Sequence, residues 1–254
     1  MDESTNDPCV LLEWDSGFFG FPIARVHGDV LNDDLAVRID AWCRQQNVSC
    51  LYFPATSNDP NTTLAAERHG FRLVDVRSTF ERTLTPGAPK SEATRLRVAT
   101  AADLPTLRAI ARENHLDSRF YADDRFSRDS CDRLYECWIE RSCNGYADRV
   151  LVAESNGHAA GYISCHRMTA QNEGSIGLLG VARQARGQGL GGALVAGAVS
   201  WFAGEGLAAV SVVTQARNVS SQRLYQRCRF VTRSVQLYYH KWYSAEASGG
   251  GEQR

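Results

Sequence analysis

The sequence predicts a mixed α/β fold in two parts, and three features of the chain indicate it. Apolar segments with strand character alternate with segments of helical periodicity along the chain. A stretch rich in Pro, Gly, Ser and Thr, residues 83–94, interrupts this alternation. A turn with four glycines, "RQARGQGLGG" (183–192), lies between an apolar run and an alanine-rich, helix-like segment. We therefore expect two α/β domains joined by a linker.

The first part is predicted to have the order β, α, β, α, β. Strands are expected at residues 21–30 and 48–55, with a helix between them over about 34–46. A short helix at 62–70 then runs into a long strand at 71–84. We assign residues 1–85 to an N-terminal α/β domain and residues 86–94 to the linker.

The second part, residues 95–243, carries more elements. A strand at 94–100 is followed by a helix at 101–115, in which Asp103 and Pro105 are start signals, and by a second helix at about 128–143. Further strands are expected at 149–155, 159–168, 175–181 and 207–214, with a long helix to about residue 203 and another at 220–228. Two closing strands follow at 230–235 and 237–242, and residues 244–254 have the composition of a disordered tail.

The two parts end in a similar way. "AERHGFRLVDVRSTFERTL" (66–84) and "YQRCRFVTRSVQLYYHKWY" (225–243) each read as a helix end, an aromatic residue and a long strand. Setting Phe71 against Phe230 places Ala66 opposite Tyr225 and Asp59 opposite Asn218. The first part has no glycine-rich turn, so we expect the chemistry in the second part.

Composition excludes several classes of partner and cofactor. Lys and Arg number 28 against 29 for Asp and Glu, which leaves no positive excess for nucleic-acid binding. Uncharged stretches are too short to span a membrane, so we expect no membrane partner. The acidic start "MDESTNDPCV" predicts a cytoplasmic protein. No C-x-x-C or H-E-x-x-H pattern is present, and we expect no metal site.

Three interpretations of the glycine turn compete. A P-loop requires G-K-[ST], which the chain does not have at this place. Gly187, Gly189 and Gly192 satisfy the dinucleotide fingerprint G-x-G-x-x-G, but the next strand lacks the acidic residue that holds the ribose. The third interpretation is a different pyrophosphate, held by free backbone N–H groups where a helix begins.

The spelling "QARGQGLG" (184–191) after a strand resembles the Q/R-x-x-G-x-G/A motif of the GNAT acyltransferase superfamily, with one register from Gln184 and one from Arg186. "LRVATAADLPTLRAIA" and "NVSSQRLYQRCRF" resemble the family's opening and closing segments. The resemblance covers residues 95–243 and implies a GNAT fold that uses acetyl-CoA. It makes the N-terminal domain a candidate degenerate half-GNAT. The implied cofactor-binding residues are Leu179, Val181, Arg186, Gly187, Gln188, Gly189, Leu190, Gly191 and Asn218.

The resemblance also implies a mechanism. Tyr225 would be the general acid in direct attack of an amine on the acetyl thioester. His166, Glu173 and water remain alternatives for the base. Attack through an acyl-cysteine at Cys165 or Cys228 is the less favoured route, because neither has a partner base that the sequence can place. One departure from the family is Arg229, where a glycine is usual.

A narrower similarity concerns the acceptor. "LEWDSGFFGFPIARV" (12–26) and "DSRFYADDRF" (117–126) are similar to segments of the dTDP-fucosamine (dTDP-4-amino-4,6-dideoxygalactose) acetyltransferases. This implies a dTDP-linked amino sugar as the acceptor, with Asp117 and Arg119 as substrate-binding residues or, alternatively, as parts of a solvated loop. Acetylation of another small amine or a peptide N-terminus, and a non-catalytic acyl-CoA sensor, remain alternatives. The N-terminal domain is expected to form an acceptor wall or a homodimer contact.

Overall fold

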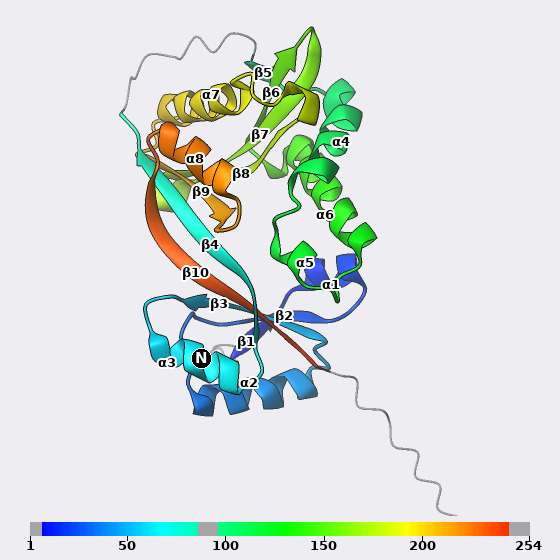
Figure 1. Cartoon of the computed structure of the whole chain (residues 1–254), viewed down its shortest axis with the longest axis vertical. Helices are drawn as coiled ribbons and strands as arrows, with labels where there is room; N and C mark the ends of the chain where they lie inside the picture. The colour runs from blue at the N-terminus through cyan, green and yellow to red at the C-terminus, as the bar shows by residue number, and fades with distance from the viewer. Residues whose placement is uncertain (1–6, 86–95, 244–254) are drawn as a thin grey trace, which may run out of the picture. The chain divides into compact units, whose positions relative to one another are not determined.

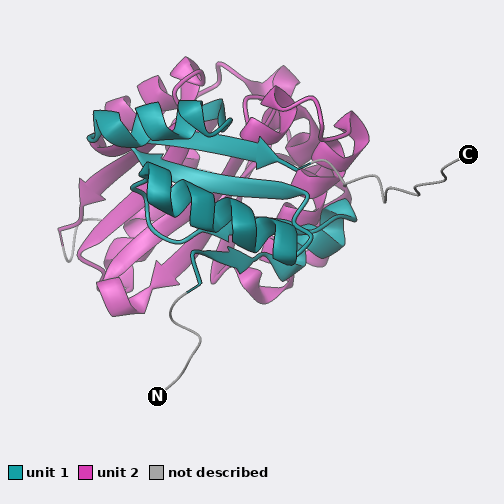
Figure 2. Cartoon of the chain, turned by 90° about the horizontal axis from the view of Figure 1, so that it is seen from below, with its two compact units in different colours: residues 1–76, 236–254 teal, residues 77–235 magenta. Residues whose placement is uncertain are grey.

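The computed structural model describes residues 7–85 and 96–243. The chain divides into two compact units, described separately below: unit 1 comprises Met1–Val76 and Gln236–Arg254, and unit 2 comprises Arg77–Val235 (Figures 1 and 2). The predicted linker, residues 86–94, and the predicted tail, residues 244–254, lie outside the described residues.

Unit 1 is a sheet whose apolar core is shared with two of its helices. Its elements are β1 (Cys9–Leu11), α1 (Glu13–Phe19), β2 (Ile23–Val26), α2 (Asp33–Gln45), β3 (Cys50–Thr56), α3 (Pro60–Arg68), the start of β4 (Arg72–Thr83) and the end of β10 (Val231–Trp242). β2 pairs with β1 antiparallel and with β3 parallel, and β10 pairs with β3 antiparallel. Buried side chains from α2, α3 and β3, among them Ile39, Ala66 and Phe53, form one apolar core.

Unit 2 contains the remaining elements. They are β5 (Leu96–Val98), α4 (Leu104–Asn114), α5 (Arg119–Ala122), α6 (Arg128–Arg141), β6 (Arg149–Ser155), β7 (His158–Met168), β8 (Glu173–Val181), α7 (Leu190–Gly204), β9 (Ala209–Gln215) and α8 (Val219–Arg227), with short 3-10 helices such as η5 (Arg183–Ala185). Its strands run in the order β4-β9-β8-β7-β6-β5, and only the β8–β9 pair among them is parallel. The sheet is therefore mixed, as the sequence predicts.

Helices cover both faces of the unit 2 sheet. A Cβ added to Gly161 of β7 would meet Leu194 of α7, whereas one added to Gly180 of β8 would meet Ile110 of α4 and the ring of Tyr162. Because neighbouring positions on a strand point to opposite faces, α7 and α4 lie on opposite sides of β7 and β8. Burial of α7 explains its composition: Leu194, Val195, Ala198, Val199, Phe202 and Ala203 are all buried.

The ends of the two units differ from the sequence-based expectation. The two closing strands predicted at 230–235 and 237–242 form one strand, β10, and β1, α1 and α5 were not predicted. The unit boundaries fall inside β4 and β10, after Val76 and Val235, rather than after residue 85. The physical reason for the second boundary is pairing: from Gln236 onward β10 is hydrogen-bonded to β3 of unit 1.

Candidate active site

The site lies where two parallel strands of unit 2 separate. β8 and β9 pair from Glu173–Ala209 to Ile176–Val212, and beyond this point β8 is paired with β7 and no longer with β9. A β-bulge marks the same place, because Ser164 of β7 lies opposite both Gly177 and Leu178 of β8. The Ser164 Oγ accepts a hydrogen bond from the Leu178 N–H at 2.8 Å. The last residues of β8 therefore present a strand edge toward β9.

Two N–H groups of β8 point to that edge. The Ala182 N–H donates to Ala160 O of β7 at 2.8 Å, so position 182 faces β7. N–H directions alternate along a strand, which turns the N–H groups of Leu179 and Val181 away from β7. The Val181 N–H donates instead to the side-chain Oδ1 of Asn114 at 3.4 Å. Leu179 and Val181, two of the cofactor-binding residues that the family resemblance implied, thus have N–H groups on the side away from β7.

The glycine turn connects β8 to α7 through η5. Gly187 and Gly189 have φ of 79° and 80°, a left-handed conformation that L-residues rarely adopt. Gly189 is the N-cap of α7 and has no side chain to cap the helix. The Ala193 N–H is the first to bond within the helix, to Gly189 O at 3.1 Å. The earlier N–H groups therefore have no partner inside α7, and the helix dipole adds positive potential there.

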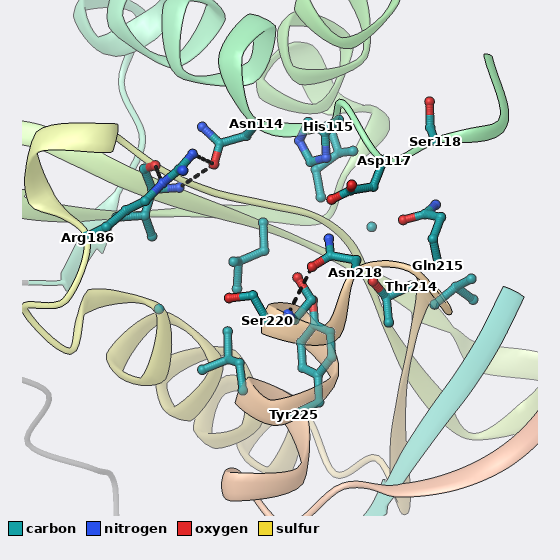
Figure 3. Close-up of a pocket in the computed structure, with 18 of the residues that line it drawn as sticks. Asn114, His115, Asp117, Ser118, Arg186, Thr214, Gln215, Asn218, Ser220 and Tyr225 are labelled. Atoms are coloured by element: carbon teal, nitrogen blue, oxygen red, sulfur yellow. Dashed lines mark hydrogen bonds between the residues drawn. The ribbon is translucent and has the colours of Figure 1, made fainter. Parts of the chain in front are cut away.

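These features line one cavity of about 670 Å³ (Figure 3). Its lining includes Leu179 and Val181 from β8, Arg186, Gly187, Gly189, Leu190 and Gly191 from the turn, Asn218 and Tyr225 from α8, and Asp117 and Arg119 from the α4–α5 region. The cavity thus contains every candidate site residue except Gln188. The Gln188 Oε1 accepts from the Ser155 hydroxyl at 3.2 Å, and its Nε2 donates to Gln184 O at 3.4 Å.

Helix α8 positions two of the candidate residues. Asn218 is its N-cap, and its Oδ1 accepts a hydrogen bond from the Ser221 N–H at 3.0 Å. Because the oxygen is used in the cap, the amide Nδ2 is the part of Asn218 that faces the cavity (Figure 3). Tyr225 lies two turns further along the helix, is 4% exposed and packs against Phe80 and Phe230. Its burial raises the pKa of the phenol above the usual range.

Arg186 is held toward α4. Its Nη2 donates to Asn114 Oδ1 at 3.1 Å, and its Nε donates to Val181 O at 3.3 Å (Figure 3). The Asn114 Nδ2 donates to Ile110 O at 2.7 Å, which ties the amide to the end of α4. Asn114 thus connects the end of α4, the end of β8 and the guanidinium of the turn.

A histidine and a tyrosine line the cavity near Asp117, and a second tyrosine, buried behind them, contacts the histidine. His115 Nε2 lies 3.0 Å from the Tyr162 hydroxyl, and the imidazole stacks on the Tyr135 ring with 4.5 Å between centroids. Burial lowers the pKa of His115 to about 4, so the ring is neutral at pH 7. It is a polar wall without charge, next to the carboxylate of Asp117 (Figure 3).

The side chains considered as bases or nucleophiles lie elsewhere. Glu173 is at the opposite end of β8, paired with Arg233 at 2.8 Å. His166 lies beside Gly177 but is not part of the cavity lining, and burial lowers its pKa. Cys165 is buried within the sheet, which raises its thiol pKa to about 12. Burial also raises the pKa of Cys228, and neither thiol lines the cavity.

Sequence reasoning missed several lining residues. Asn114 and His115 are the last residue and the C-cap of α4, and Thr214 and Gln215 end β9. For Thr214 and Gln215 the available signal was their place at the carboxyl end of a predicted strand, since ligands of α/β sheets bind at the carboxyl ends of the strands. Tyr135 and Trp138 lie on α6, and the apolar periodicity of a helix does not reveal that one edge of its apolar face lines a cavity.

Comparison with known proteins identifies this geometry. Residues 109–230 match the acetyltransferase (GNAT) family, a range that contains the open edge of β8, the glycine turn and Tyr225. Unit 2 of this chain is a GNAT acetyltransferase domain. The matched range ends at Phe230, just before β10.

The chain is also similar to one curated protein and to solved structures of the same fold. The chain is 28% identical over 145 residues to the spore coat polysaccharide biosynthesis protein SpsD of Bacillus subtilis (strain 168), a match that spans 57% of this chain and half the length of that relative. A GCN5-related N-acetyltransferase from Sphaerobacter thermophilus has a similar fold, with a TM-score of 0.64 and 18% identity over 92% of this chain and 76% of that one. A tandem GNAT protein from the clavulanic acid biosynthesis pathway superimposes with a TM-score of 0.59 and 14% identity, over 88% and 76% of the two chains.

Residues 7–85 and 96–243 hold no group of three or more His, Cys, Asp or Glu side chains arranged for a metal ion. Within those same ranges, none of the helices has both the length and the apolar composition for a membrane span.

Proposed function

We propose that the protein is an N-acetyltransferase that moves the acetyl group of acetyl-CoA to the amine of a nucleotide-linked amino sugar. The observation that carries this proposal is the shared cavity, in which the glycine turn, the open edge of β8 and the side chain of Tyr225 meet. Each suits a different part of a thioester cosubstrate. The glycine turn suits an anion, the edge of β8 suits an amide-bearing arm, and the Tyr225 hydroxyl suits a sulfur leaving group.

Binding of acetyl-CoA is assigned to backbone N–H groups. The free N–H groups at the start of α7 suit a pyrophosphate, and the glycines let it approach the backbone closely. The N–H groups of Leu179 and Val181 suit the pantetheine carbonyl and the thioester oxygen. Because the Val181 N–H donates to Asn114 in this structure, we expect that ligand binding breaks this hydrogen bond.

Acetyl-CoA supplies an activated acetyl group, and the chain supplies positioning and a proton. The amine nitrogen forms a bond to the acetyl carbon, the carbon–sulfur bond breaks, and the Tyr225 hydroxyl gives its proton to the sulfur. The proton lost by the nitrogen passes to water, since His166 and Glu173 do not line the cavity. Burial makes the phenol a weaker acid, but the same surroundings raise the proton affinity of the departing thiolate.

The acceptor class rests on the loop after α4 and on the similarity to SpsD. Asp117 and Arg119 line the same cavity as Tyr225, so a sugar bound there would have a carboxylate and a guanidinium beside it. We assign the amine or a hydroxyl group to Asp117 and a phosphate oxygen to Arg119. The relative that shares 28% identity is, by its name, a polysaccharide biosynthesis protein.

The decisive experiment is thiol release from acetyl-CoA by the purified protein. dTDP-4-amino-4,6-dideoxygalactose is compared with the free amino sugar, a polyamine and a short peptide. Rapid turnover with the nucleotide sugar supports the proposal. Turnover confined to the polyamine or the peptide would keep acetyl transfer and overturn the acceptor. If the protein bound acetyl-CoA but released no CoA thiol with any of the four acceptors, the sensor alternative would be favoured.

A further inference from the structure

A second cleft in unit 2 carries a concentration of arginines. It has a volume of about 610 Å³ and is lined by Arg112, Glu113 and Leu116 of the α4 end, Arg128 and Asp132 of α6, and Arg183 and Arg186 around η5. We call it the arginine cleft. Apart from Arg186, which also lines the acetyl-transfer cavity, these residues have no role in the acetyl-transfer chemistry derived above.

The charges lining the arginine cleft do not balance. Arg112 pairs with Glu136 at 3.3 Å and with Asp132 at 3.5 Å, and Arg128 lies 3.8 Å from the same Asp132 carboxylate. Arg186 donates only to neutral oxygens of Val181 and Asn114. Arg183 is exposed, and no ion pair is found for it within residues 7–85 and 96–243. Four guanidinium groups against the carboxylates of Glu113 and Asp132 in the lining, and that of Glu136 behind Arg112, leave the cleft with net positive charge.

The arginine cleft continues from the acetyl-transfer cavity. Arg186 lines both hollows, and the chain at the end of α4 alternates between them: Asn114 and His115 face the cavity, whereas Arg112 and Glu113 face the cleft. A ligand whose reactive end is beside Asp117 thus has a positively charged extension of the cavity within reach. A free amino sugar has no group that this extension would bind.

The cleft also differs in position from the glycine turn. Its walls are α4, the first turns of α6 and η5, and α4 lies on the face of the sheet opposite α7. The guanidinium of Arg186 reaches to Asn114 of α4, whereas the free N–H groups of the turn belong to the start of α7. The domain therefore offers two places for anions, one at the start of α7 and one on the α4 side.

We propose that the arginine cleft binds phosphate oxygens of the acceptor in addition to the one assigned to Arg119, and that the substrate is accordingly an amine carried on a nucleoside diphosphate. This inference rests on the proposed acetyl transfer and adds a binding site and a reason for the acceptor's charge. Guanidinium groups suit phosphates because their planar N–H pairs match two phosphate oxygens. Acetyl-CoA carries phosphate as well, at its 3′ position, and the test separates these two sources.

The test uses Arg128→Gln, Arg183→Gln and the double variant, with Arg133→Gln as the matched control. Arg133 is an exposed arginine of the same helix α6, paired with Asp129 and outside the cleft. Calorimetric binding of dTDP and steady-state kinetics with dTDP-4-amino-4,6-dideoxygalactose are measured at constant ionic strength. Thermal unfolding of each variant checks that the fold is kept.

We expect each cleft substitution to raise the Kd for dTDP and the KM for the nucleotide sugar by about tenfold, as loss of one charged hydrogen bond does. The KM for acetyl-CoA and that for the free amino sugar should stay the same, and Arg133→Gln should change none of these constants. Equal dTDP affinity in wild type and double variant would overturn the inference.

A different result would reveal the other phosphate source. If the double variant raised the KM for acetyl-CoA but not that for acetyl-dephospho-CoA, the cleft would hold the 3′-phosphate, and the inference would be wrong. Absence of acetyl transfer to the nucleotide sugar by the wild type would count against the proposed function. The dTDP measurement needs no turnover and would still decide whether the cleft binds phosphate.

Discussion

Arg229 and Gly70 occupy equivalent places in the two halves of the chain, and both have a left-handed backbone, with φ of 64° and 73°. Each stands two residues after the last residue of a nine-residue helix and just before a buried phenylalanine, Phe230 or Phe71. The phenylalanine N–H donates to Tyr225 O in one half and to Ala66 O in the other, at 3.0 and 2.9 Å. A twelve-residue strand follows in both.

We expect Arg229→Gly to stabilise the protein. A left-handed conformation costs a non-glycine residue about 1–2 kcal/mol, and the greater chain entropy of glycine in the unfolded state offsets part of this gain. The net rise in the free energy of unfolding should be about 0.5–1 kcal/mol, measured by urea denaturation. Gly70→Ala is the matched reverse change. It has no atom within 4 Å of the added Cβ, so its expected loss reflects backbone conformation alone.

An unchanged or lower stability of Arg229→Gly, together with a loss in Gly70→Ala, would show that the Arg229 side chain makes a compensating contribution. In either case kcat should not change, because Arg229 does not line the cavity.

The repeat between the halves was visible in the sequence for a physical reason. The alignment of Phe71 with Phe230 predicted that Asp59 and Asn218 are equivalent, and each is the N-cap of its helix. Capping residues and buried aromatic anchors are local signals that survive when other positions change. The same alignment placed Ala66 at the position of Tyr225, so the equivalent helix of unit 1 has no phenol to donate a proton.

The cavity was only partly predictable. The glycine turn and Tyr225 belong to continuous motifs, which a single sequence can reveal. Asn114, His115 and Tyr135 reach the same cavity from two helices, and their convergence depends on how α4 and α6 pack on the sheet. The arginine cleft was missed because its arginines are spread from residue 112 to residue 186. Spacing in the sequence carries no information on such a cluster.

Tyr225→Phe is expected to lower kcat by about 10²- to 10⁴-fold, the usual contribution of a positioned general acid. The ring still fills its place between Phe80 and Phe230, so the KM for acetyl-CoA and the unfolding temperature should change little. Tyr146→Phe is the matched control, since the Tyr146 side chain is largely exposed and lies outside the cavity. A Tyr225→Phe enzyme with the kcat of the wild type would exclude Tyr225 as the proton donor.

His115 should make the protein less stable in acid. Burial lowers its pKa to about 4 from the usual 6.5, so between these values the unfolded chain binds more protons than the folded one. Stability therefore rises with pH through this window, and it is lost as the pH falls from about 6.5 to about 4. The urea midpoint should fall further between pH 7 and pH 4.5 for the wild type than for His115→Gln. Equal falls in the two proteins would contradict a buried, neutral imidazole.

Asn114→Ala is expected to weaken the hold on Arg186. The substitution removes the oxygen that accepts from both Arg186 and the Val181 N–H. The Val181 N–H would then be free before the cosubstrate arrives, whereas the guanidinium would lose its anchor. If the lost anchor of Arg186 outweighs the freeing of the Val181 N–H, the KM for acetyl-CoA rises by a few fold, corresponding to about 1 kcal/mol. A double-mutant cycle with Arg186→Ala measures the coupling, and purely additive effects would exclude it.

Asp117 and Arg119 should separate the two ends of the acceptor. If Asp117 binds the amine or a hydroxyl of the sugar, Asp117→Asn raises the KM by about tenfold for the nucleotide sugar and for the free amino sugar alike. If Arg119 binds a phosphate oxygen, Arg119→Ala raises the KM for the nucleotide sugar alone. Neither change should alter the KM for acetyl-CoA, because both residues lie on the α4–α5 side of the cavity and not at the glycine turn. Equal effects of Arg119→Ala on both acceptors would remove the phosphate assignment, and a rise in the KM for acetyl-CoA would place the residue beside the cosubstrate instead.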